Sequence, residues 1–406
     1  MVQQVRFRNS VYIILLLLFS NCSSKEKNKE DKMRYVNTHD VSIKTALGIT
    51  YVNDFAYSGT LFTLYANGSD TIEVKEFLNG KENGTWKQFY KNNQLKEIRY
   101  FENGKKTGWY FSWWENGNKK SNAQFLNDEY EGTLKDWSSE GKLIKEMNYH
   151  AGHESGSQKA WYENGKIKSN YTIINGRRYG LLGTKNCMMY PIVFLRNNFC
   201  LILLLYLLSS CKADKKVNLP YYNTPDFTPV FVDHEKDIKE KITHTISDFS
   251  FADQHGKMIT QQNIEGKIHV ANFFFTSCGS ICSIIMNNMS QVNNAYLTDK
   301  NIVFLSYTVT PWIDSVPRLK EYADLHQYKN PNWYMLTGNK SAIYQLARKS
   351  YFAEEDIGFS KDSTNFLHTE HFILVDKNKK IRGIYNGTLS LEIQQLIEDI
   401  KVLKEE

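Results

Sequence analysis

Two hydrophobic patterns divide this chain of 406 residues and predict two different folds. Between residues 59 and 180, apolar and polar positions alternate in short stretches that are separated by Asn-Gly pairs. Such alternation predicts antiparallel strands, and Asn-Gly between them is the strongest short-range signal for a hairpin. From about residue 248 onward, almost continuous apolar runs alternate with segments of helical length. This second pattern predicts an α/β domain with a buried central sheet.

The alternating region is an internal repeat. Five glycines fix its period, and each follows the previous one by 24 residues: Gly84, Gly108, Gly132, Gly156 and Gly180. Each unit is expected to open with its glycine and to continue into an aromatic-rich strand. A fixed period of this length predicts a stacked all-β array, because one hairpin cannot bury its apolar face without a neighbour.

The turns and aromatic residues of the repeat predict structure rather than chemistry. Asn-Gly pairs recur within and between the units, at Asn79, Asn103, Asn116, Asn164 and Asn175. We expect both residues of each pair to take positive φ. The aromatic residues at alternate strand positions are expected to form the core of the array rather than a ligand platform.

No residue type that carries chemistry recurs at one position of the repeat sequence. His150 and His153 occur in one unit, where we expect them in a loop. The repeats are therefore interpreted as a catalytically inactive binding or scaffolding surface.

The second region predicts a mixed sheet with helices. A hairpin over residues 246–257 turns at Gly256 and precedes a buried strand over residues 266–275. A helix then follows through Met286. Further strands are predicted over residues 302–309, 371–376 and 381–385, and further helices over residues 315–325 and 341–348 and from residue 390 to the end. The last two strands form a hairpin, which makes the sheet mixed.

An apolar run over residues 11–19 follows two arginines and precedes Cys22. A basic start, a short apolar core and small residues after it are typical of a secretory signal peptide. The run is short for a transmembrane helix. Cys22 at this place resembles the lipobox of bacterial lipoproteins, which implies cleavage before Cys22 and lipid attachment to it. The alternative is a plain N-terminal membrane anchor.

The same pattern occurs again in the middle of the chain. Met188 and Met189 could start it, an apolar run covers residues 199–208, and Cys211 follows two serines as a second candidate for lipid attachment. Export of the first segment would bring the second to the membrane from the wrong side. We therefore interpret the chain as two adjacent lipoprotein genes read as one frame. An internal membrane span is the alternative, for which about ten apolar residues are marginal.

These patterns give the boundaries of the segments. They are a signal peptide (1–21), a linker (22–58), the repeats (59–187), a second signal-like segment (188–210), a second linker (211–240) and the α/β domain (241–406). The net charge of +6 is spread along the chain, and no basic cluster is large enough to indicate nucleic-acid binding. Cys187 beside Met188 and Met189 makes a cluster of soft donors, for which the alternative is an accident of the junction.

Cys278 and Cys282 directly follow the predicted central strand and begin the next helix. A helix N-terminus stabilises a thiolate, and the spacing places both side chains on one helical face. The pair could close a disulfide or hold one metal ion, and thiolates suit Cu(I). His368, in a loop before the strand at residue 371, is the best candidate for a third ligand. A permanent structural disulfide is the alternative, because an exported protein meets an oxidising compartment.

The sequence resembles known families in both regions. The aromatic, Asn and Leu-Lys positions between Gly84 and Tyr100 resemble MORN-type repeats over about residues 59–180. The likeness is greatest to the variant found in proteins labelled as antitoxin components, and it implies little about chemistry.

The segment that ends in Asn-Phe-Phe-Phe-Thr-Ser-Cys at Cys278 resembles the Sco/SenC family over about residues 248–400. Its other matching positions are Cys282, Leu305-Ser306, Pro311, Asp314, Leu336 to Gly338, His368 and Asp376. The resemblance implies a thioredoxin-like fold that binds one copper ion, as Cu(I) or Cu(II), through Cys278, Cys282 and His368.

Members of this family help to deliver copper to cytochrome c oxidase, and some act as thiol–disulfide reductases. The resemblance implies a lipid-anchored copper-binding protein of the cell envelope that faces the periplasm or the exterior. Its partner would be a cytochrome c oxidase subunit or another copper acceptor. The alternative is a thiol–disulfide oxidoreductase or a peroxiredoxin-like enzyme, in which Cys278 and Cys282 would be catalytic. The three-residue spacing and the histidine favour copper.

The chain departs from the family pattern near the cysteines. Gly279 and Ser283 stand where proline is usual, and Thr310 replaces the aspartate of an Asp-Pro pair. We expect these changes to alter redox potential and partner recognition more than metal binding. His371 is expected to be a strand residue rather than a ligand.

Overall fold

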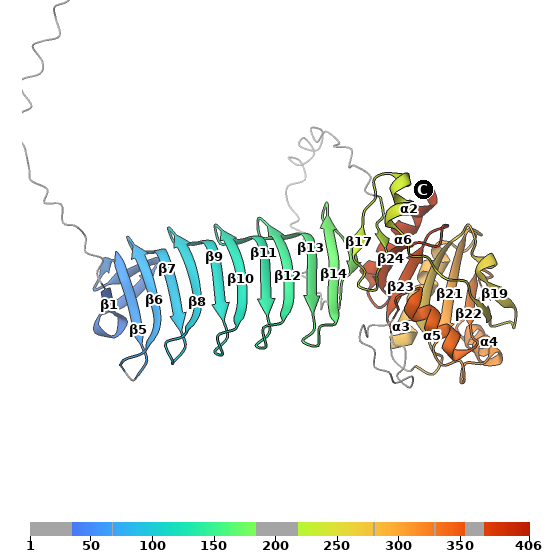
Figure 1. Ribbon diagram of the computed structural model, residues 1–406, viewed down its shortest axis with the longest axis horizontal. Helices are drawn as coiled ribbons and strands as arrows, with labels where there is room; N and C mark the ends of the chain where they lie inside the picture. The colour runs from blue at the N-terminus through green and yellow to red at the C-terminus, as the bar shows by residue number, and fades with distance from the viewer. Residues whose placement is uncertain (1–34, 67, 184–217, 279–280, 329, 354–368) are drawn as a thin grey trace, which may run out of the picture.

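The computed structural model describes residues 35–66, 68–183, 218–278, 281–328, 330–353 and 369–406. Figure 1 shows an elongated β array, blue to green, whose last strands lie against a compact α/β domain, yellow to red. Both predicted fold classes are therefore confirmed. Within the described ranges, no helix has the length and apolar character needed to cross a membrane. Both signal-like segments lie outside them, as do Cys22, Cys187 and Cys211.

The array is a sheet of twelve strands in the described part of the chain, in the order β1-β5 and then β6 to β15 in sequence. β1 runs parallel to β5, and every later pair is antiparallel. The strands are β1 (Tyr35–Asn37), β5 (Gly59–Leu64), β6 (Thr71–Leu78), β7 (Lys81–Phe89), β8 (Leu95–Glu102), β9 (Lys105–Trp113), β10 (Lys119–Leu126), β11 (Glu129–Trp137), β12 (Leu143–His150), β13 (His153–Trp161), β14 (Ile167–Ile174) and β15 (Arg177–Leu181).

The repeat glycines lie inside the strands, which corrects the expectation that each unit opens with its glycine. Gly84 is the fourth residue of β7. The strand starts earlier because the turn before it needs only Asn79 and Gly80, whose φ values are 52° and 79°. Gly84 itself has a φ of 102° at a bulge, where a Cβ atom would lie 2.0 Å from a carboxylate oxygen of Glu76. That carboxylate accepts the backbone N–H and the hydroxyl of Thr85.

The Asn-Gly pairs form two kinds of turn. Positive φ at both residues is found at Asn79, Asn103 and Asn175. It was wrongly predicted at Asn116 and Asn164, where among the pair only the glycine takes positive φ. These pairs belong to longer loops, since the N–H of Trp114 donates to the carbonyl of Asn118 and encloses the turn.

The two histidines of the repeat lie in strands rather than in a loop. His150 ends β12 and His153 begins β13, and the two are paired across the sheet. Nδ1 of His150 lies 3.0 Å from Oε1 of Glu131. The intervening turn takes only two residues, which leaves no loop for the histidines to occupy.

Aromatic side chains join one unit to the next. The Tyr65 hydroxyl donates to the Phe89 carbonyl at 3.1 Å, and the Tyr90 hydroxyl donates to the Trp113 carbonyl at 2.9 Å. Trp114 repeats this contact through its indole N–H. Phe77, Phe101 and Tyr171 are buried as expected of a core, whereas Trp109 and Tyr162 are about half exposed, so the prediction holds for only part of the aromatic residues.

Both stretches that were predicted as linkers contain folded elements. Residues 22–58 include β1 and a three-stranded sheet of β2 (Ile43–Ala46), β3 (Ile49–Val52) and β4 (Phe55–Ala56). Residues 211–240 include β16 (Tyr221–Tyr222), β17 (Pro229–Val230) and most of α2 (Glu235–Lys241). These elements are too short to produce a hydrophobic period, which is why the sequence pattern missed them.

The α/β domain has a five-stranded sheet in the order β22-β21-β20-β23-β24. The first three strands are parallel, whereas β23 is antiparallel to β20 and to β24. Its elements are β18 (Ser250–Ala252), β19 (Met258–Thr260), β20 (Ile268–Phe274), α3 (Ile281–Ala295), β21 (Ile302–Thr308), α4 (Val316–Leu325), β22 (Trp333–Leu336), α5 (Lys340–Lys349), β23 (His371–Val375), β24 (Ile381–Asn386) and α6 (Ser390–Glu405). All the strands and helices predicted for this region are present, and β22 was not predicted.

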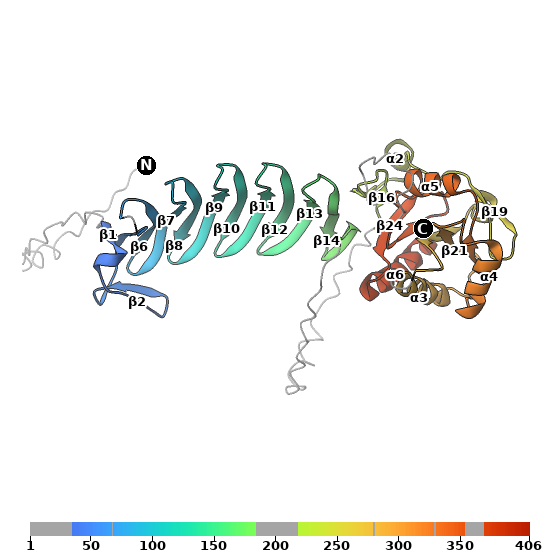
Figure 2. The ribbon, with the colours of Figure 1, turned by 90° about the horizontal axis from the view of Figure 1, so that it is seen from below.

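Two apolar cores cover the two faces of this sheet. Side chains of α3, α4 and α6 pack on one face, and those of α5 and the β18–β19 hairpin pack on the other. Figure 2 shows α3 and α6 together on one side and α5 on the other. Every residue of β20 and β21 is buried, as the continuous apolar runs predict.

Candidate metal and thiol centre

The two predicted cysteines meet where the central strand ends. β20 leaves the core at Phe274, and a short turn leads to Cys278, whose N–H donates to the Phe275 carbonyl at 3.4 Å. Cys282 lies in the first turn of α3. Cys278 is half-buried and Cys282 is buried. The sequence spacing therefore places both sulfurs at the N-terminus of one helix, as expected.

In the structure both sulfurs are thiols, and no disulfide joins them. The backbone N–H of Cys282 donates to Sγ of Cys278 at 3.4 Å. Burial, followed by the hydrogen bond with Cys278, raises the pKa of the Cys282 thiol to about 12. A sulfur that receives a helix N-terminal N–H is well placed to carry negative charge. Cys278 is the more exposed of the two sulfurs, and the raised pKa of Cys282 favours its thiol form until a metal ion displaces the proton.

A buried carboxylate holds the cysteine turn against the rest of the sheet. Asp314 is fully buried before α4, and its side chain accepts the hydroxyls of Thr276, Thr308 and Thr310. It also accepts the backbone N–H of Thr276 at 3.2 Å. The turn that carries Cys278 is thus tied to the end of β21. The family resemblance includes Asp314, but no sequence pattern predicts that three threonines converge on it.

An aromatic side chain that the sequence did not suggest lies near the thiols. Burial raises the pKa of Tyr322 on α4, and the nearby Cys282 and Cys278 raise it further. Its ring lies 5.8 Å from that of Phe274. Tyr322 therefore forms part of a nonpolar wall beside the thiols.

A buried chain of polar side chains fixes α3 on β20 below the cysteines. The indole N–H of Trp333 donates to the Ser306 hydroxyl at 2.9 Å, and that hydroxyl donates to Asn272 at 2.6 Å. The Asn272 amide in turn lies 3.6 Å from the sulfur of Met286 on α3. Such a satisfied buried chain makes the position of the helix specific.

The third predicted ligand, His368, lies outside the described residues. His371 begins β23, and its Nδ1 lies 3.1 Å from the Thr369 hydroxyl. Because β23 is antiparallel to β20, the first residue of β23 lies beside the C-terminal end of β20, where the turn that carries Cys278 starts. Among the residues that the structure describes, no three His, Cys, Asp or Glu side chains form a metal-binding group. The structure thus brings two of the three predicted ligands together.

The donors present suit a soft metal. Two sulfurs one helical turn apart, one of them half-exposed, can reach a single ion, and thiolates favour Cu(I) over hard cations. Asp314, which could have attracted a hard cation, is instead saturated by threonine donors.

Comparison with known proteins finds a family match in each half. Residues 238–405 match the SCO1/SenC family model, and residues 82–103, 130–151 and 154–175 match the MORN repeat variant. The SCO1 protein homolog of Bacillus subtilis is 28% identical over 166 residues, which are 40% of this chain and 85% of that protein. Protein sco1 of Schizosaccharomyces pombe is 30% identical over 151 residues, 36% of this chain and 56% of that one.

Solved structures show the same likeness. A SCO1/SenC family lipoprotein from Bacillus anthracis is 26% identical with a TM-score of 0.36, over 40% of this chain and 96% of that one. Yeast Sco1 with copper bound is 22% identical with a TM-score of 0.31, over 39% of this chain and 89% of that one.

Proposed function

We propose that this protein binds copper and passes it to an acceptor. The proposal starts from the match of residues 238–405 to the SCO1/SenC family and from the match of the first half to the MORN repeat variant. The ligands are Cys278, Cys282 and His368, and one ion binds per C-terminal domain. The observation that carries the proposal is the pair of reduced thiols at the N-terminus of α3.

The antiparallel start of β23 supports His368 as the third ligand. His371 begins that strand beside the end of β20, and His368 is three residues before it in sequence. His371 itself faces Thr369, which gives its ring a different partner. Imidazole suits copper in both oxidation states, so adding it to two thiolates extends the site from Cu(I) to Cu(II).

The names of the relatives support the acceptor. A solved Sco structure is described as a member of the Sco family of cytochrome c oxidase assembly proteins, and another as Sco1 with copper bound. We therefore place a cytochrome c oxidase subunit first among the acceptors of this protein. Lipid on Cys22, and on Cys211 if the second segment is processed, would hold it in the cell envelope.

Copper titration of the full chain tests the site. The other four cysteines are replaced by serine, so that Cys278 and Cys282 are the remaining thiols. We expect about one equivalent of Cu(I), and a visible sulfur-to-Cu(II) charge-transfer band when Cu(II) is added. Cys278→Ala and Cys282→Ala should each abolish tight binding, because one thiolate cannot form the site.

The two histidines provide a matched comparison. His368→Ala should weaken Cu(II) binding more than Cu(I) binding, whereas His371→Ala should leave both almost unchanged. A chain that takes up no copper, or that needs His371 instead of His368, would refute the assignment.

A thiol–disulfide reductase is the second candidate function. The half-exposed Cys278, as a thiolate, can attack a substrate disulfide, form a mixed disulfide and release one substrate thiolate. Cys282, once it has lost its proton, then attacks the Cys278 sulfur, which releases the second substrate thiolate and leaves a Cys278–Cys282 disulfide. Rapid reduction of a disulfide substrate by the full chain, together with no copper uptake, would favour this candidate over copper delivery.

A further inference from the structure

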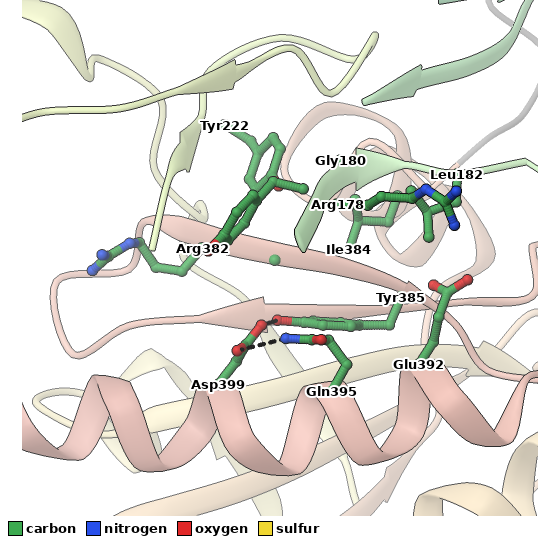
Figure 3. Close-up of a pocket in the computed structure, with 12 residues that line it drawn as sticks. Arg178, Gly180, Leu182, Tyr222, Arg382, Ile384, Tyr385, Glu392, Gln395 and Asp399 are labelled. Carbon is green, nitrogen blue, oxygen red and sulfur yellow. Dashed lines mark hydrogen bonds between the residues drawn. The ribbon is translucent and has the colours of Figure 1, made fainter. Parts of the chain in front are cut away.

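The repeat array and the SCO1/SenC domain share a contact made by the last hairpin of the array. β15 lies against β24 and α6 of the domain (Figures 1 and 3). Arg177 on β15 forms an ion pair with Asp399 on α6, although 222 residues separate them in sequence. Asp399 is buried and also accepts the hydroxyl of Tyr385 at 2.6 Å and the amide of Gln395 at 3.1 Å.

Apolar and aromatic side chains pack beside the ion pair, in which Asp399 is buried and Arg177 is partly exposed. Tyr179 on β15 is buried, and its ring meets that of Phe231 edge-on at 5.4 Å. The guanidinium of Arg177 lies 4.7 Å from the centre of the Tyr179 ring. Tyr179 belongs to the same apolar core as α3 and α6, and Leu181 packs on the core of the opposite face. Side chains of the array thus extend both cores of the domain.

The chain between the two halves is also fixed to the array. Asn170 on β14 is buried, and its amide donates to the Asp226 carbonyl at 2.7 Å and to the Thr228 hydroxyl at 2.8 Å. A Cβ atom at Gly180 would lie 3.2 Å from the Phe227 carbonyl. Backbone therefore packs on backbone here, with no side chain between.

The contact is closely packed around Tyr385. Figure 3 shows Arg178, Gly180 and Leu182 of the array beside Ile384 on one side of β24, and Tyr385 on the other side toward Asp399 of the helix. A pocket of about 30 Å³ that is partly open to solvent remains between them.

We infer that the β14–β15 hairpin is a specific docking element that holds the array on the SCO1/SenC domain without help from the covalent connection. A buried carboxylate that has lost its cation is costly, so Asp399 and Arg177 each favour the docked state. The buried Tyr179 and Asn170 add apolar burial and satisfied hydrogen bonds. The inference does not depend on copper, and it applies whether the cell makes one polypeptide or two.

Cleavage of the purified full chain tests the inference. A protease recognition sequence is inserted after residue 195, different affinity tags are placed at the two ends, and the chain is cut in mild detergent after folding. The half that carries the C-terminal tag is then captured at increasing dilution. We expect the repeat half to be retained at micromolar concentration. Separation of the halves of the otherwise unmodified chain would overturn the inference.

Charge variants make the test specific. Arg177→Glu and Asp399→Arg should each weaken retention at least tenfold, and the double variant should recover a large part of the loss. Lys135→Glu is the control and should change retention less than twofold, because Lys135 pairs with Glu146 inside the array and away from the contact. Circular dichroism of each captured half shows whether it is folded. Folded halves that bind equally well with Arg177→Glu, or that are weakened as much by Lys135→Glu, would also overturn the inference.

Discussion

Thr276 donates its hydroxyl to Asp314 at 2.5 Å, and this bond ties the turn that carries Cys278 to the loop before α4. Thr308 and Thr310 approach the same carboxylate from the end of β21. Thr310 stands where the Sco/SenC pattern has aspartate. In this chain the position serves as a hydrogen-bond donor to a buried carboxylate, which explains how threonine is accommodated there.

Asp314→Ala should lower the free energy of unfolding of the domain by about 3 kcal/mol, because the change leaves several buried donors without an acceptor. It should also weaken copper binding, since the cysteine turn loses its anchor. Chemical denaturation and copper titration of the full chain measure the two effects. Asp324→Ala on α4 makes the same chemical change at an exposed ion pair and should cost less than about 0.5 kcal/mol. Equal losses in the two variants would contradict the anchoring role.

Local sequence signals were enough to predict the cysteine centre and the array. Strand β20 has an uninterrupted apolar run, and the spacing of Cys278 and Cys282 fixes their position on a helix. The 24-residue period likewise reflects an identical environment in each unit. Such features depend on residues that are close in sequence, which is why the sequence alone predicts them.

Contacts between distant residues could not be predicted in this way. The convergence of Thr276 on Asp314 spans 38 residues, and the pairing of Arg177 with Asp399 spans 222. Neither arginine nor threonine has a local pattern that reveals such a partner. The glycine positions were misplaced for a related reason, since the bulge at Gly84 depends on Glu76 of the neighbouring strand.

Arg382→Lys should destabilise the domain by about 2 kcal/mol or more. The buried guanidinium donates to the carbonyls of Leu219 and Pro220 and to both carboxylate oxygens of Glu406, at 2.6 and 3.1 Å. A lysine ammonium cannot reproduce this planar set of donors. Thermal denaturation measures the effect, with Arg348→Lys on the exposed side of α5 as the control. Equal melting temperatures for the two variants would show that the planar geometry is unimportant.

Glu392 should make the domain less stable as pH rises from about 4.5 to 7. Burial raises its folded pKa from 4.5 to about 7 against the opposing hydrogen bond from the Asn386 N–H, and the nearby Glu370 acts in the same direction as burial. The folded state therefore binds more protons than the unfolded state in this range, so the free energy of unfolding falls with rising pH. The loss is at most about 3 kcal/mol.

Glu392→Gln should remove this slope because the amide oxygen can still accept the Asn386 N–H without carrying charge. Urea denaturation at several pH values measures the difference between the variant and the unmodified chain. Glu398→Gln, on the exposed side of the same helix, should leave the slope unchanged. A Glu392→Gln chain with the original pH dependence would assign the slope to other groups.

The repeat array and the SCO1/SenC domain should occur in the cell as two mature polypeptides. The second signal-like segment, from Met188 to Cys211, predicts a separate export event for the second half. Antibodies against residues 59–180 and against residues 248–400 should therefore detect different, smaller species on an immunoblot of the native host. The purified full chain, at 47.3 kDa, serves as the size control. A single 47-kDa species that both antibodies detect would contradict this prediction.

The docking contact of Arg177 with Asp399 allows a stricter test. Two separate polypeptides that meet through this contact should be recovered together under native conditions and apart after denaturation.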